Sequence, residues 1–134
     1  MEIGEVVDKI SAVLQGFKEV EVAYLFGSYA TGEARATSDV DIAILAPQLG
    51  LDRFCELWSC ITIAAGTERI DLVTLDDKPA LFRYEVIKEG RLIYCKNDET
   101  LNDFEMKSWQ AYMDGKHIRG IYLNDFYAGL SRGI

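Results

Sequence analysis

The sequence predicts a single α/β domain that ends in a helical segment. Segments with apolar residues every three or four positions alternate with short runs rich in valine, isoleucine and aromatic residues. The chain of 134 residues is 49% hydrophobic, which is enough for one core, and no repeat or low-complexity linker divides it. We therefore expect one domain over residues 1–134, with a core at about 20–95 and a C-terminal helical segment at about 98–131.

The first half of the chain predicts one helix and two strands. Residues 2–17 place their apolar side chains on one helical face. Residues 19–26 are rich in valine, tyrosine and phenylalanine and stop at Gly27, as expected of a strand that enters a tight turn. Residues 39–46 predict a second strand, which ends before Pro47.

The second half predicts two further pairs of helix and strand. Residues 51–66 predict a helix that closes at a glycine, and 69–75 a third strand. Residues 79–90 predict a helix with a C-terminal glycine, followed by a short fourth strand at 91–95.

The tail from residue 101 onward has helical spacing and many aromatic residues, with Gly115 and Gly120 as points where the helix could be interrupted. Such spacing favours packing against the sheet, and a surface for a helical partner is the alternative. The aromatic residues concerned are Phe104, Trp109, Tyr112, Tyr122 and Phe126.

Composition narrows the classes of function. A net charge of −8 and a pI near 4.6 are unfavourable for nucleic-acid binding, which needs clustered lysine and arginine. His117 is the only histidine, which argues against a histidine-centred triad or zinc site. No leader or membrane span is recognisable, and the three cysteines lie in apolar stretches as expected of free core thiols. We expect a soluble, cytoplasmic protein.

One short stretch carries the chemistry. In "GSYATGEARATSDVDIAIL", a Gly-Ser pair is followed after ten residues by two aspartates that open an apolar strand. Alternate residues of a strand share a face, so Asp39 and Asp41 project together while Val40 and Ile42 point the other way. Two carboxylates this close repel each other and are costly to bury unless a cation or several hydrogen-bond donors lie between them. Mg²⁺ is the natural candidate, because it suits oxygen ligands and phosphate-bearing substrates.

A third carboxylate, Asp71, lies on the following predicted strand and points away from Ile70 and Leu72. If the two strands are neighbours, three aspartates converge, as two-metal phosphoryl or nucleotidyl transfer requires. An isolated acid on a strand is also common as a solvent-facing residue, so this assignment depends on the neighbouring pair. At the other end of the stretch, Gly27 permits a close backbone approach, and Ser28 with the following amides offers donors to phosphate.

These residues together resemble the DNA polymerase β-like nucleotidyltransferase superfamily, and the short chain looks like its minimal nucleotidyltransferases. The resemblance covers roughly residues 20–95. It implies a short mixed β-sheet with flanking helices, use of Mg-ATP with two Mg²⁺ ions, and transfer of AMP to a hydroxyl group. Members of the minimal group are commonly antitoxins that silence a small helical HEPT-type toxin by adenylylating a tyrosine.

Carried over residue by residue, the resemblance implies that Gly27 and Ser28 bind phosphate. It implies that Asp39, Asp41 and Asp71 are catalytic and hold the metal ions, with Asp71 as the third carboxylate.

Two further nucleotide-binding candidates follow from the same resemblance. Ser38 occupies a position that is often serine in the family. Many relatives have arginine directly before the second glycine of the motif, whereas this chain has Thr31 before Gly32, and Arg35 is the nearest arginine. Arg35 is therefore the candidate for the triphosphate contact.

Three functions fit these observations. The leading hypothesis is a Mg²⁺-dependent adenylyltransferase that modifies a partner protein, because the chain is too short for the second domain that usually completes a cleft for a small acceptor. The second is a toxin-binding module that neutralises its partner by contact alone. The third is a transferase for a small cationic molecule such as an aminoglycoside, with a homo-oligomer supplying the cleft.

Overall fold

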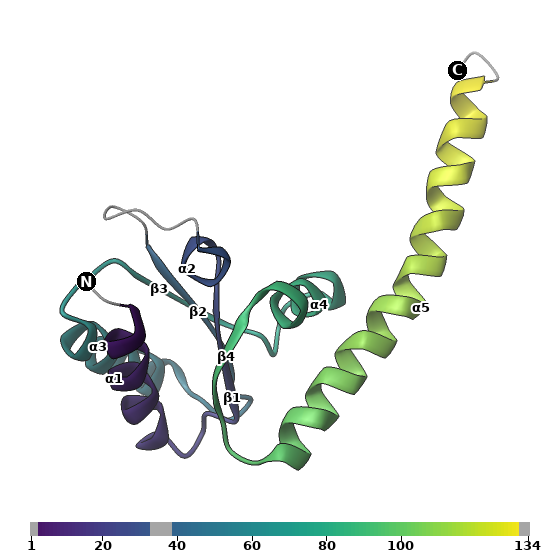
Figure 1. Cartoon of the computed structure of the whole chain (residues 1–134). Coiled ribbons are helices and arrows are strands. Elements are labelled where there is room, and N and C mark those ends of the chain that lie inside the picture. The colour runs from purple at the N-terminus through teal and green to yellow at the C-terminus, as the bar shows by residue number, and fades with distance from the viewer. Residues whose placement is uncertain (1–2, 33–38, 132–134) are drawn as a thin grey trace.

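The computed structural model describes the backbone of residues 3–32 and 39–131. It also describes the side chains of these residues, except those of residues 31 and 116–131. Its centre is a four-stranded sheet in the order β3-β2-β1-β4 (Figure 1). β2 is parallel to β3, and β1 is antiparallel to both β2 and β4, so the sheet is mixed as expected. The strands are β1 (Val22–Phe26), β2 (Val40–Leu45), β3 (Ile70–Thr74) and β4 (Arg91–Cys95).

Helices cover both faces of the sheet. Helices α1 and α3 pack together on one face, and α4 packs with the start of α5 on the other (Figure 1). All strands and the long helices lie within a few residues of the predicted ranges; the short α2 had no predicted range of its own. The helices are α1 (Ile3–Gln15), α2 (Ser28–Thr31), α3 (Leu51–Ala65), α4 (Ala80–Glu89) and α5 (Asp98–Ser131).

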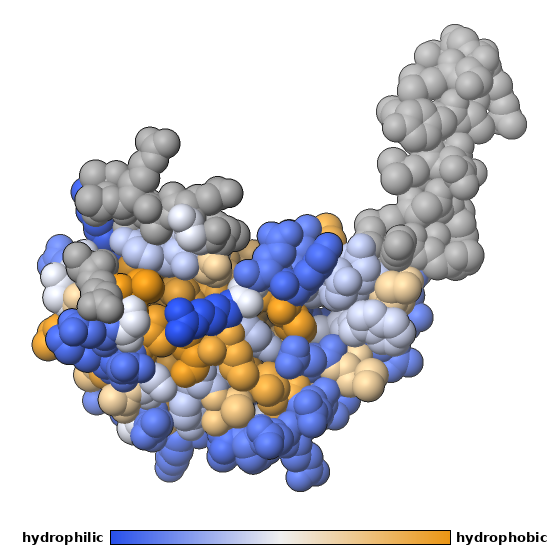
Figure 2. All heavy atoms as spheres, in the orientation of Figure 1, coloured by the Kyte–Doolittle hydropathy of each residue, from blue (hydrophilic) through white to orange (hydrophobic). Residues whose placement is uncertain are grey.

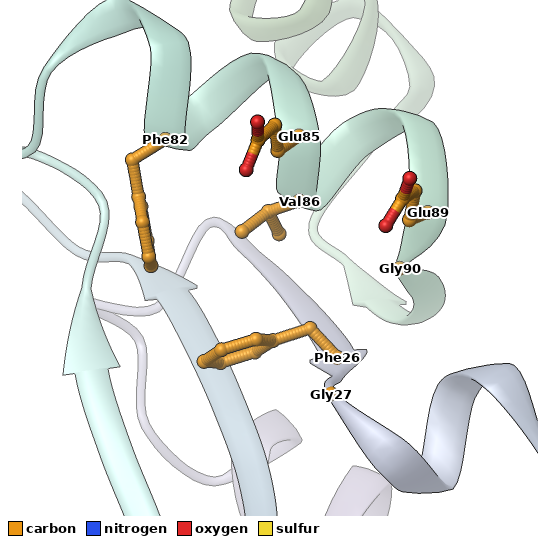
Figure 3. Close-up of a pocket in the computed structure, with 7 residues that line it drawn as sticks. All are labelled: Phe26, Gly27, Phe82, Glu85, Val86, Glu89 and Gly90. Carbon is orange, nitrogen blue, oxygen red and sulfur yellow. The ribbon is translucent and has the colours of Figure 1, made fainter. Parts of the chain in front are cut away.

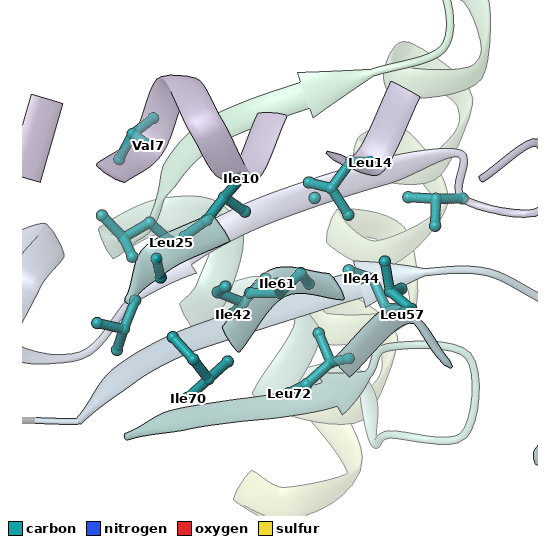
Figure 4. Close-up of a cluster of buried hydrophobic side chains, with 14 of the residues drawn as sticks. Val7, Ile10, Leu14, Leu25, Ile42, Ile44, Leu57, Ile61, Ile70 and Leu72 are labelled. Atoms are coloured by element: carbon teal, nitrogen blue, oxygen red, sulfur yellow. The ribbon is translucent and has the colours of Figure 1, made fainter. Parts of the chain in front are cut away.

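The larger core lies between the sheet and the α1–α3 layer (Figure 4). Alternate residues of the central strand β2, Val40, Ile42 and Ile44, point into it and are fully buried. They meet Ile61 of α3 and Ile10 of α1, which lie on the apolar stripes of their helices. Because these residues point to the α1–α3 layer, the residues between them on β2 must point to the opposite face of the sheet.

The second face of the sheet is covered by a smaller cluster. Ala43 of β2 and Tyr24 of β1 pack here with Val86 of α4 and Phe104 of α5. Because side chains alternate along a strand, Asp41, two residues before Ala43, belongs to this second face. The smaller cover leaves room for polar groups at this end of the sheet.

The apolar surface over the β4 edge is visible in the space-filling view. Figure 2 shows apolar atoms gathered over β4 between α1 and α4. Leu92 on this strand is 41% exposed.

Within residues 3–32 and 39–131, no helix combines the length and the hydropathy needed to cross a membrane.

The structure answers one question that the sequence left open and corrects one expectation. Helix α5 is continuous through both Gly115 and Gly120, since an interior glycine costs a helix only about 1 kcal/mol. Cys55 is not a core thiol but is exposed, because the buried stripe of α3 runs through Leu57 and Ile61, on the opposite side of the helix. Cys60 and Cys95 are free and half-buried.

A matched pair of substitutions on α3 tests the core assignment. Ile61 is fully buried and Ile63 is 81% exposed on the same helix. We expect Ile61→Ala to lower the free energy of unfolding by about 2–5 kcal/mol, because it leaves a cavity in the core. Ile63→Ala should change it by less than about 0.5 kcal/mol in the same urea titration. Equal losses would contradict the orientation of α3.

Candidate active site

Three side chains form a row across the second face of the sheet. Phe26 at the end of β1 pairs with Asp41 of β2, and Asp41 pairs with Asp71 of β3. Paired residues of neighbouring strands point to the same face, so the register alone brings the two carboxylates side by side. Asp71 is exposed and Asp41 is half-buried. The structure therefore joins two of the aspartates singled out in the sequence, 30 residues apart along the chain.

The surroundings of Asp41 disfavour its negative charge. Burial raises its pKa, and the negative charges of Asp71 and Asp39 and a hydrogen bond with Asp71 raise it further. Ionisation of Asp41 is therefore opposed by electrostatic repulsion from the neighbouring carboxylates. A bound cation would relieve that repulsion, and this is the electrostatic setting expected of a metal site.

Gly27 lies directly against this pair. A Cβ atom built at position 27 would collide with Oδ2 of Asp41, so no side chain fits between β1 and the carboxylate. The backbone at Gly27 has φ 71° and ψ −151°, a conformation that only glycine adopts readily. Helix α2 begins at the next residue, Ser28, and the Gly27 carbonyl accepts a hydrogen bond from the amide of Ala30 at 3.1 Å. The Gly-Ser pair therefore places the start of α2 beside Asp41.

A pocket of about 300 Å³ opens beside Gly27, between the end of β1 and α4 (Figure 3). The rings of Phe26 and Phe82 meet edge to face, with centroids 6.0 Å apart, and form its apolar floor. Glu85 and Glu89 of α4 bring two carboxylates to its rim. The pocket thus has an apolar base and hydrogen-bond acceptors.

The remaining candidates take different positions. Asp39 is exposed, just before β2, and its charge acts on Asp41. Among the described residues, no three histidine, cysteine, aspartate or glutamate side chains form a group that could hold a metal ion by themselves. Arg35, Ser38 and the side chain of Thr31 lie outside the described part of the chain.

No sequence motif identifies the pocket residues. The sequence predicts only a strand at Phe26 and a helix at Phe82, Glu85 and Glu89. The spacing of the two glutamates, one helical turn apart on α4, placed both on one face. Only the packing of α4 against β1 shows that this face adjoins Gly27.

Comparison with known proteins identifies the family of the chain. Residues 8–99, well over half of the chain, match the family described as "Polymerase beta, Nucleotidyltransferase". The chain belongs to this nucleotidyltransferase family.

Relatives of this nucleotidyltransferase include toxin–antitoxin proteins. It is 26% identical over 121 residues to the protein adenylyltransferase MntA of Shewanella oneidensis, covering 89% of this chain and 85% of MntA. It is 26% identical to a chain of a toxin–antitoxin complex crystallised with AMP-PNP, with a TM-score of 0.73 and coverage of 90% and 98% of the two chains. A complex of a tri-AMPylated Shewanella oneidensis HEPN toxin with its MNT antitoxin shares the fold, with a TM-score of 0.68 at 24% identity over 91% and 96% of the chains.

Replacement of Gly27 tests the close approach to Asp41. We expect Gly27→Ala to abolish nucleotidyltransferase activity and to destabilise the protein, because the methyl group must displace the carboxylate. Gly32 is the matched control: it has φ 79° but open space around its Cβ position. Gly32→Ala should cost only the backbone strain of about 1–2 kcal/mol in a urea titration. An active Gly27→Ala variant would contradict the contact.

The raised pKa of Asp41 predicts a pH-dependent stability difference. The folded protein keeps a proton on Asp41 at pH values where the unfolded chain, with an ordinary pKa of 3.8, has lost it. This group therefore lowers the free energy of unfolding as the pH rises above about 4. Asp41→Asn should be more stable than the unmodified protein at pH 7, and the difference should shrink toward pH 4, in urea titrations with EDTA. Asp103→Asn on the exposed face of α5 is the control; a pH-independent gain in Asp41→Asn would contradict the charge repulsion.

Proposed function

We propose that this protein is a Mg²⁺-dependent protein adenylyltransferase that acts as an antitoxin by transferring AMP from ATP to a hydroxyl of a HEPT-type toxin. The observation that carries the proposal is the Asp41–Asp71 pair beside Gly27 and its pocket. The name of MntA and the AMP-PNP bound to a relative's complex support the choice of nucleotide and reaction. In this proposal, residues 1–134 work as one domain.

Asp39, Asp41 and Asp71 would hold the metal ions. The two adjacent carboxylates fit Mg²⁺, which commonly takes one or two carboxylates and completes its shell with phosphate oxygens and water. The lack of a preformed group of three ligands among the described residues is compatible with this mode, since the nucleotide would supply the rest. When bound, the metal would neutralise charge on the phosphates and increase the acidity of the acceptor hydroxyl.

Gly27 and Ser28 would hold the phosphates of ATP. Gly27 leaves the space beside Asp41 that a side chain would fill, and the amides at the start of α2 offer donors. We assign the neighbouring pocket to the adenosine, with the base against Phe26 and Phe82. Glu85 and Glu89 can accept hydrogen bonds from the amino group of the base. Arg35 and Ser38 remain proposed triphosphate contacts.

The acceptor would be a hydroxyl group. Its oxygen forms a bond to the α-phosphorus, the bond from that phosphorus to the bridging oxygen breaks, and pyrophosphate leaves. Asp71, at the outer end of the carboxylate pair, would take the proton of the hydroxyl. The products are the adenylylated acceptor and pyrophosphate.

A protein acceptor is favoured by an exposed apolar groove between α4 and α5. This groove of about 710 Å³ is lined by Tyr84 and Ile87 of α4 and by Met106 and Trp109 of α5. Met106 is 63% exposed and Trp109 is 49% exposed. Such a surface is typical of a site for another protein.

The three free cysteines agree with a cytoplasmic setting, where thiols stay reduced.

Label transfer tests the function directly. The purified protein is incubated with Mg²⁺, the product of the adjacent gene and ATP labelled at the α- or the γ-phosphate. We expect only the α label to reach the acceptor protein. Asp39→Asn/Asp41→Asn should reduce transfer by at least about a thousandfold, because the proposed metal ligands are lost. Removal of Mg²⁺ with EDTA should have the same effect on the unmodified protein.

A charge-matched control separates a site effect from a general loss of acidity. Asp8→Asn/Asp103→Asn changes two exposed aspartates outside the site and should leave transfer unchanged. Transfer of the γ label would show kinase chemistry and refute the proposal. Association of the two proteins without transfer of either label would favour the contact-only antitoxin.

A further inference from the structure

A groove runs along the outer edge of β3, which pairs with no further strand in the described part of the chain. β3 is the outermost strand on its side of the sheet. The groove has a volume of about 540 Å³ and is walled by Phe54 and Trp58 of α3 and by Ile70 and Leu72 of β3. Asp71 also lines it. The groove lies on the α3 side of this edge, whereas the side chain of Asp71 points to the other face with Asp41. Asp71 therefore marks the place where the groove and the proposed reaction site meet at the edge of the sheet.

The backbone of β3 faces this groove with hydrogen-bonding groups. The amide of Val40 donates to the Arg69 carbonyl at 2.8 Å, and the amide of Leu75 donates to the Ile44 carbonyl at 2.7 Å. In a parallel pair, alternate residues of a strand direct their backbone groups to the same neighbouring strand. The two bonds show that residues 69, 71, 73 and 75 direct theirs to β2, so the N–H and C=O groups of Leu72 point to the outer edge.

Trp58 limits where a ligand can pair with this edge. Its Nε1 donates a hydrogen bond to the Ile70 carbonyl at 3.0 Å, so that carbonyl already has a partner from α3. The bond also holds the indole ring as one wall of the groove. Pairing with an added strand would therefore centre on Leu72, directly after Asp71.

The two substrates must approach the carboxylate pair from different sides. Gly27 and the adenosine pocket lie on the β1 side of Asp41. Asp71 lies on the β3 side, and the groove begins there. An acceptor that reaches Asp71 along the groove would not compete with the nucleotide for space.

We propose that an extended segment of the acceptor protein binds along the β3 edge and presents its hydroxyl to Asp71. Its backbone pairs with Leu72 as an added strand, and an apolar side chain rests against Phe54 and Trp58. This inference rests on the proposed function and adds the way in which the protein substrate is bound.

A bulky residue on the α3 wall tests the groove. Cys55 is exposed and lines the groove, so Cys55→Trp would fill it without disturbing the core. Ile63→Trp adds the same ring to an exposed position of the same helix that does not line the groove. Ser59→Trp, on the groove wall one turn after Cys55, is a second blocking variant.

The readout is the steady-state transfer of α label from ATP to the product of the adjacent gene, with thermal unfolding measured in parallel. We expect Cys55→Trp and Ser59→Trp to raise the KM for the acceptor protein about tenfold or more. A tenfold change is the effect on affinity expected when one favourable contact with the acceptor is lost. The KM for ATP should not change. Ile63→Trp, which lies outside the groove, should leave both constants unchanged.

The outcomes separate the two proposals. If the unmodified protein transfers label and both groove variants match Ile63→Trp, the groove assignment is wrong while the proposed function stands. An equal rise in the KM for ATP would also overturn it, because the effect would then be on the whole site. If the unmodified protein transfers no label, the proposed function fails and the groove assignment fails with it.

Discussion

The register of β2 between β1 and β3 is the constraint on which the site depends. Val40, Ile42 and Ile44 are fully buried against α1 and α3, so a slip by one residue would drive Asp41 into an apolar core. The packing of the core thus determines on which face of the sheet Asp41 lies and which residues of β1 and β3 it pairs with. Phe26, Asp71 and Gly27 take their places relative to Asp41 through pairing and close contact with this strand.

The two faces of the sheet divide stability from chemistry. The α1–α3 face holds the larger core, whereas the α4–α5 face has a smaller cluster and leaves Asp71 exposed and Asp41 half-buried. Partial solvation lowers the cost of placing two carboxylates side by side, although burial and repulsion raise the pKa of Asp41. A thicker cover would exclude water and also the substrates. The smaller second cluster is therefore the part of the fold that leaves these carboxylates accessible to solvent.

Local patterns predicted much of the fold. All four strands and the long helices were expected from periodicity, and the convergence of Asp41 and Asp71 followed once their strands were taken as neighbours. The strand order β3-β2-β1-β4 came from no local pattern, because it depends on contacts between distant segments. The pocket over Phe26 depends in the same way on how α4 docks. The exposure of Cys55 differs from the sequence-based expectation, because the position of a residue around its helix decides burial more than the apolar character of the residues beside it in the sequence.

The parallel pairing of β2 with β3 also bears on how the protein folds. Asp41 and Asp71 meet across a crossover of residues 46–69 that contains all of α3, whereas β1 and β2 are joined by the shorter connection of residues 27–39. Contacts between distant segments form late, because the intervening chain must first be ordered. A chain emerging from the ribosome can therefore pair β1 with β2 and place Gly27 against Asp41 while the carboxylate pair is still absent. The pairing of Asp41 with Asp71 arises only when β3 docks, so an incomplete chain that ends before β3 carries only one half of the candidate site.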